Sequence, residues 1–103
     1  MKKGKMEMDK IYLAVGEIVT KLAEHKKMIL LDYSKESQKG TVFMTTDEAC
    51  VCVHTSGIFV TAKSNIDNIK EYKKILLSDS SRVRSHFGYS EIDDVVRTIL
   101  NTK

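Results

Sequence analysis

One short basic run carries the residue types of a phosphate-binding site. Arg82, Arg84 and His86 alternate along the chain, so an extended backbone places their side chains on one face. Guanidinium groups and an imidazole can bind a phosphodiester, and a histidine can act as general acid or base beside arginines that stabilise charge on phosphorus. Small RNases that need no metal use residue types of this kind. A catalytic site of this kind also needs a second acid or base, and the spacing of the residues identifies none. Contact with phosphate or an acidic partner is therefore the stronger prediction.

Three lysines precede this run at the spacing of one helix face. They extend it into a basic patch that consists of Lys70, Lys73, Lys74, Arg82 and Arg84, with His86 beside it. Lysines are also the usual solvated coat of an amphipathic helix, and no aromatic ladder for stacking bases accompanies them. The net charge is only +3 and the pI is about 8.8. A nucleic-acid-binding module at residues 70–84 is therefore the second hypothesis and a metal-independent RNase a third.

Cysteine and histidine alternate in a third candidate run. Cys50, Cys52 and His54 fall on one face of an extended segment and span roughly 13 Å, whereas zinc ligands lie within about 2.0–2.3 Å of the metal. No CxxC pair, glycine-rich phosphate loop or other cofactor motif accompanies them. We therefore expect no metal and no cofactor. Two cysteines at this spacing do not form a relaxed disulfide, and free thiols indicate the cytoplasm.

The same alternation makes one strand face unusually apolar. With Val51 and Val53 turned toward covering helices, the other face presents an apolar set together with Cys50. This set is predicted as a partner interface and consists of Leu30, Phe43, Cys52, His54 and Phe59. Coverage of the face by the second or third helix is an equally open alternative. A protein partner is the leading expectation, and a homodimer is another possible use of this face.

The periodicity of the apolar residues predicts the elements that position these groups. A stripe at i, i+3, i+4 and i+7 predicts a helix over 8–26, and similar stripes predict helices over 65–77 and 91–101. Between them, 27–33, 41–46, 49–55 and 58–62 have strand character with short connections. Residues 1–5 are expected to be a solvated tail, and 78–89 show no clear period.

This order of elements predicts one α+β domain over residues 1–103. It has an N-terminal helix, an antiparallel three- or four-stranded meander and two C-terminal helices in two layers. Charges interrupt the N-terminal apolar stretch, and no apolar run approaches the roughly 20 residues of a membrane helix, so no membrane association is expected.

The small size and the lack of an active-site motif favour a non-catalytic interaction protein. Inhibitors, immunity proteins and adaptors that dock onto a macromolecule have this character. Proteins of phages and mobile elements that inhibit a defence nuclease or a toxin are examples. The comparison is one of size and composition, and it names no residue.

Overall fold

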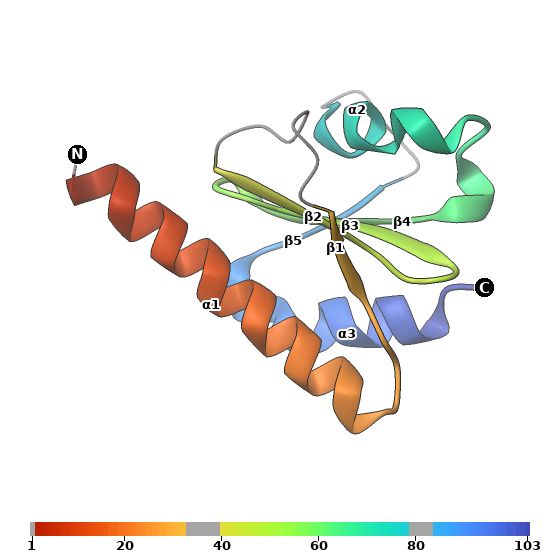
Figure 1. The fold of residues 1–103 in the computed structure, drawn as a ribbon, viewed down its shortest axis with the longest axis horizontal. Helices are drawn as coiled ribbons and strands as arrows, with labels where there is room; N and C mark the ends of the chain where they lie inside the picture. The colour runs from red at the N-terminus through yellow and green to blue at the C-terminus, as the bar shows by residue number, and fades with distance from the viewer. Residues whose placement is uncertain (1, 33–39, 79–83) are drawn as a thin grey trace.

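The computed structural model describes residues 2–32, 40–78 and 84–103, with side chains from residue 9 onward. Within these ranges a five-stranded antiparallel sheet in the order β1-β2-β3-β4-β5 lies between helices on its two faces (Figure 1). The helices are α1 (Lys2–Glu24), α2 (Tyr72–Leu77) and α3 (Ile92–Asn101), and short 3-10 turns are η1 (Lys63–Asn65), η2 (Ile69–Glu71) and η3 (Tyr89–Glu91). The strands are β1 (Leu30–Asp32), β2 (Thr41–Thr45), β3 (Ala49–His54), β4 (Gly57–Ala62) and β5 (Ser85–Phe87).

The predicted α+β class and the meander are confirmed, with three differences. The sheet has a fifth strand, β5, which pairs with β4 inside the segment that showed no period. The helix expected from residue 8 begins at Lys2, because lysine, methionine and glutamate favour helix and no proline interrupts them. The two expected layers become three, because α2 lies on the sheet face opposite α1 and α3 (Figure 1).

The first core lies between the sheet and the pair α1 and α3. The stripe predicted on α1 is buried there, with Ile11, Ile18 and Leu22 fully inaccessible. It meets the sheet face predicted to be covered, which consists of Ile29, Leu31, Val42, Met44, Val51, Val53, Ile58 and Val60. The register fixes this face, because Val42 pairs with Val53 and Val53 with Ile58. Alternation in the sequence therefore predicted this face correctly.

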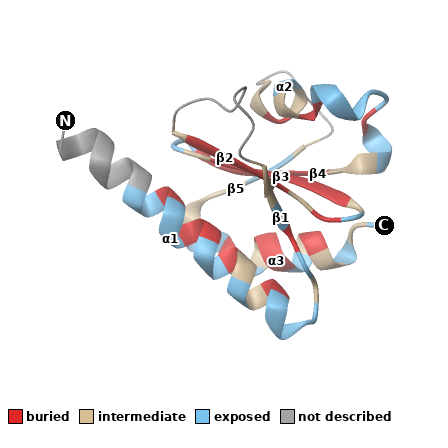
Figure 2. Ribbon diagram, viewed as in Figure 1, coloured by how far each residue is buried: buried red, intermediate tan, exposed pale blue. Residues whose placement is uncertain are grey.

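The second core lies under α2, on the face predicted as a partner interface (Figure 2). Its members are Phe43, Cys50, Cys52, Phe59, Ile66, Tyr72 and Leu76. The Phe43 and Tyr72 rings meet edge to face with centroids 5.8 Å apart. The Tyr72 hydroxyl donates a hydrogen bond to Asp32 Oδ2 at 2.5 Å, and Lys73 Nζ lies 3.2 Å from the same oxygen. These polar contacts tie α2 to the edge strand β1.

Among the described residues, no helix has both the length and the apolar character needed to cross a membrane.

Replacing Phe43 by alanine tests whether α2 covers this face. Phe43 is fully buried, so Phe43→Ala should lower the free energy of unfolding in urea by about 3–5 kcal/mol. Leu13→Ala is the control, because Leu13 is 75% exposed and its loss should change stability by no more than about 0.5 kcal/mol. Equal, small effects of both substitutions would show that the face carrying Phe43 is open to solvent.

Candidate functional site

The predicted partner interface is mostly inside the molecule. Phe43 and Cys52 are fully buried and Phe59 is 5% exposed, so a partner cannot reach them in this structure. Leu30, at the start of β1, is 62% exposed, and His54 is half-buried at the end of β3. The interface prediction is therefore corrected for the three buried residues. The physical reason is that α2 buries their apolar surface within the same chain.

The two thiols lie in this second core and are held in the protonated form. Burial raises the pKa of Cys50 to about 11 and that of Cys52 to about 12. The nucleophile in cysteine chemistry is the thiolate, which these values make scarce at neutral pH. Within the described residues no group of three potential ligands gathers around a metal position. Both thiols are core side chains in this structure.

The cations of the predicted basic patch do not form one open surface. Lys73 is paired with Asp32 and is only 15% exposed. Arg84 donates a hydrogen bond to the Leu76 carbonyl at the end of α2, and its guanidinium lies 4.0 Å from the centre of the Phe59 ring. Arg84 therefore helps to close the second core, a role that no spacing in the sequence indicated.

The remaining members of the patch have different positions. Lys70 and Lys74 are exposed and line a hollow of about 470 Å³ beside α2, together with Lys73 and Leu77. Glu71 lies in the same lining and offsets part of their charge. Arg82 lies outside the described residues.

The structure brings His54 and His86 into contact with Ser56, at the turn between β3 and β4. The Ser56 amide donates to His54 Nδ1 at 3.2 Å, and the Ser56 hydroxyl lies 2.8 Å from the same nitrogen. His86 Nε2 lies 3.3 Å from the Ser56 carbonyl oxygen, and its ring stacks on Phe59 with centroids 4.7 Å apart. The register Phe59–His86 creates this juxtaposition, which sequence spacing did not predict.

These contacts stabilise the β3–β4 turn. They engage His54 Nδ1 and His86 Nε2, which acid–base chemistry would otherwise use. Because the Ser56 amide donates to Nδ1, that lone pair is engaged, and neutral His54 carries its proton on Nε2. Glycine is required at 57, because its φ is 145° and a Cβ there would lie 2.8 Å from the Phe87 carbonyl oxygen. His54 and His86, the latter the histidine of the predicted RNase site, thus pack and bond as parts of the turn.

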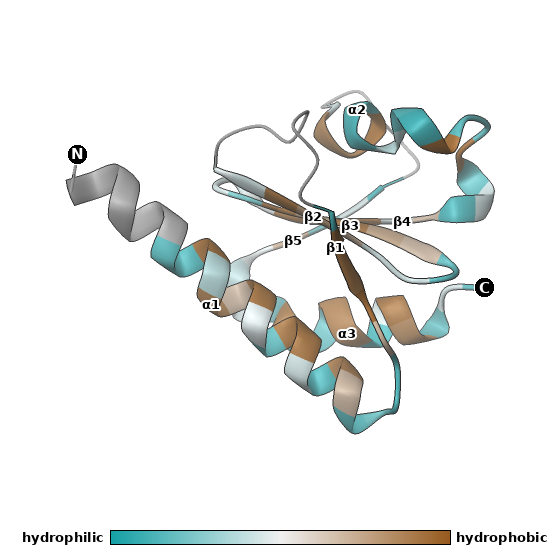
Figure 3. Cartoon of the chain, in the orientation of Figure 1, coloured by the Kyte–Doolittle hydropathy of each residue, from teal (hydrophilic) through white to brown (hydrophobic). Residues whose placement is uncertain are grey.

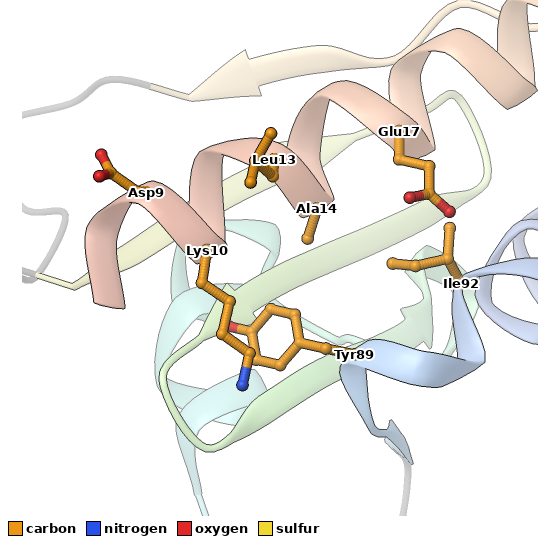
Figure 4. A pocket seen from close by; sticks show the side chains of 7 residues that line it. All are labelled: Asp9, Lys10, Leu13, Ala14, Glu17, Tyr89 and Ile92. Atoms are coloured by element: carbon orange, nitrogen blue, oxygen red, sulfur yellow. The ribbon is translucent and has the colours of Figure 1, made fainter. Parts of the chain in front are cut away.

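A second hollow lies between α1 and the start of α3 (Figure 4). It has a volume of about 420 Å³ and is lined by Asp9, Lys10, Leu13, Ala14, Glu17, Tyr89 and Ile92. Ala14 and Ile92 are buried and form an apolar floor, whereas Leu13 is 75% exposed. Figure 4 shows Lys10 and Ala14 pointing toward Tyr89 and Glu17 lying near Ile92. We call this hollow the α1–α3 groove.

Charged groups of both signs lie at the α1–α3 groove. Lys10 Nζ lies 4.4 Å from the centre of the Tyr89 ring, and the Tyr89 hydroxyl donates to the His54 carbonyl. The ring is thereby fixed at its hydroxyl end, and Glu17 lies near Ile92. A groove with an apolar floor and charged ends can bind an apolar side chain of a partner. Its charged ends can then interact with charged residues that flank this side chain. The signal in the sequence was Leu13, an apolar residue on the polar face of the predicted helix.

Comparison with family models, with curated proteins and with solved structures gives no match to this chain.

The burial of the thiols gives a first test of these assignments. At pH 8 a thiol with a pKa of about 11 has roughly a hundredfold less thiolate than one at the ordinary value of 9.0. A disulfide reagent such as dithionitrobenzoate should therefore modify Cys50 and Cys52 at least that much more slowly in the native chain than in urea. Thr20→Cys adds an exposed thiol on α1 as a control that reacts at once. Fast reaction of both native thiols in a folded chain would contradict their burial.

The raised thiol pKa values also predict how stability depends on pH. As the pH rises past 9, the unfolded chain releases thiol protons that the folded chain keeps. Their contribution is therefore complete below pH 9 and decreases as the pH approaches about 11 to 12. Tyr72 acts in the same direction, because burial and its bond to Asp32 raise its pKa. The urea concentration at the unfolding midpoint should therefore fall between pH 8 and 10.5, and it should fall less steeply in Cys52→Ala. The same dependence on pH in this variant and in the native chain would contradict the raised pKa of Cys52.

Proposed function

We propose that this chain is a small non-catalytic interaction protein that docks onto a protein partner through the α1–α3 groove. The observation that carries the proposal is Leu13, which is 75% exposed beside an apolar floor in a hollow of about 420 Å³. Full burial of one leucine side chain contributes about 1.5–3 kcal/mol, enough to anchor a contact that surrounding residues then make specific. Its two thiols suit the cytoplasm, and the inhibitor, immunity and adaptor classes fit its size.

The positions of the reactive side chains support a non-catalytic role. Within the described residues, the two thiols are buried and the Nδ1 atom of His54 is engaged in the β3–β4 turn. Asp32 is occupied by Tyr72 and Lys73. Catalysis needs a nucleophile or base that can reach the substrate, and these groups are committed to the fold.

The charges at the groove indicate the chemistry of the partner. Lys10 lies over Tyr89 at one end with Asp9 beside it, and Glu17 lies at the other end. A protein segment with an apolar side chain between an acidic and a basic residue would match both ends. Such complementarity at a rim chiefly sets orientation and the rate of association.

A nucleic-acid-binding module remains the second candidate. Lys70 and Lys74 support it, because both are exposed and line the hollow beside α2. Lys73 and Arg84 weaken it, because their cationic groups are used in contacts with Asp32 and with Leu76. This candidate requires affinity that falls steeply with salt.

A pull-down with matched variants tests the groove. The tagged chain is incubated with host lysate, with and without nuclease, beside Leu13→Glu and Leu30→Glu. Leu30 is 62% exposed on a different part of the surface, so it controls for loss of an exposed leucine. One protein retained in fixed ratio by the native chain and by Leu30→Glu should be lost from Leu13→Glu, because a carboxylate would enter an apolar contact.

Other outcomes would overturn the proposal. Retention of the same protein by all three chains would place the docking surface outside the groove. Nucleic acid that is retained by all three and released by salt would favour the basic candidate. Cleavage of RNA by the native chain, lost in His86→Ala, would contradict the non-catalytic assignment.

A further inference from the structure

One side of α1 carries a line of uncharged side chains along the edge of the core stripe, where half-buried Val19 also packs against the first core. This uncharged strip consists of Tyr12, Gly16, Val19 and Ala23, at spacings of four, three and four residues. It lies on the side of α1 away from α3, because Lys21 on the other side pairs with Asp93 of α3 at 2.9 Å. Tyr12 is 57% exposed, and a Cβ at Gly16 would meet nothing within 4 Å.

The uncharged strip ends at a hollow. It has a volume of about 330 Å³ and is lined by Val19, Ala23, Lys26, Lys27, Met28 and Ile29. Met28 is 77% exposed there. Lys27 forms an ion pair with Glu48, with Nζ 2.7 Å from Oε2. An exposed ring thus stands at one end of the strip and an apolar hollow at the other.

We propose that α1 packs antiparallel against α1 of a second copy of this chain, with Tyr12 of each copy in the hollow of the other. In a two-fold arrangement centred between Gly16 and Val19, Tyr12 faces Ala23 of the second copy. In the same register Gly16 faces Val19 of the second copy. Each large side chain meets a small one, and the two-fold axis repeats both contacts. A parallel arrangement would instead place ring against ring and leave both hollows empty.

The charges beside the strip favour the same register. Asp9 lies three residues before Tyr12, and Lys26 lies three residues after Ala23; both are exposed. Antiparallel packing places Asp9 of each copy against Lys26 of the other, whereas parallel packing places like charges together. Opposite charges at an interface rim favour one orientation over another.

The expected dimer is concentration-dependent. The strip covers eleven residue steps and is about 17 Å long, so it buries less than the roughly 800 Å² per partner of a typical stable complex. Leu13 points away from this strip by about 100° and is not part of the contact. Asp9 borders both the dimer contact and the α1–α3 groove. Gly16 and Leu13 each belong to one surface only, so variants at these two residues test the surfaces apart.

Sedimentation velocity of the full chain tests the proposal. The native chain should change from a monomer of 11.7 kDa to a dimer as its concentration rises. Gly16→Glu should raise the dissociation constant on the order of tenfold or more, because it buries a carboxylate between the helices. It clashes with nothing in one copy, so the fold should persist by circular dichroism. Leu13→Glu should leave the dimer unchanged. A native chain that stays monomeric up to about 500 µM, far above functional affinities, would overturn the proposal.

Two further variant sets identify the register. Gly16→Cys should form an intermolecular disulfide faster than Glu17→Cys, which lies beside it on the α3 side of the helix. Asp9→Lys and Lys26→Asp should each weaken the dimer, and the double variant should restore it. Equal cross-linking by both cysteine variants, or a dimer that withstands Gly16→Glu, would place the interface elsewhere and refute the proposal.

Discussion

The structure depends on a sheet that is apolar on both faces. Along β2, β3 and β4 nearly every side chain is buried, so neither face can be left to water. An antiparallel sheet commonly keeps one polar face, and this one does not. A single helical layer would leave the row Phe43, Cys52 and Phe59 exposed. The position of α2 above this row is therefore a requirement of the sequence of the strands (Figure 3).

A helix of six residues covers that row only with help from polar contacts. Tyr72 and Leu76 supply its buried side chains. Asp32 accepts a hydrogen bond from the Tyr72 hydroxyl and forms an ion pair with the Lys73 ammonium. These two contacts fix α2 over the sheet. At the other end Arg84 satisfies a carbonyl in the last turn of α2, where helices leave such groups unpaired. Charges that resemble a phosphate site in the sequence thus serve to close the second core.

What the sequence predicted well was local. The stripe of α1, the two faces of the strands and the antiparallel meander follow from periodicity and short connections. The cover of the second face was not predictable, because it depends on a contact between Asp32 and Tyr72, forty residues apart. The sequence did not predict β5, because a strand of three residues is too short to show an alternating apolar pattern. It forms by pairing with the edge of β4. His54 and His86 both contact Ser56 for the same reason, through a register that no local pattern reports.

The two large apolar residues of α1 outside its core stripe have different consequences. Single exposed apolar side chains are common on soluble proteins and need no explanation. Tyr12 and Leu13 differ from such residues because each belongs to a surface with a hollow, at the end of the uncharged strip and in the α1–α3 groove respectively. Consecutive residues of a helix point about 100° apart, so Tyr12 and Leu13 face different neighbours on the surface. The helix that holds the first core together therefore carries both proposed surfaces, one for a second copy of the chain and one for a different protein.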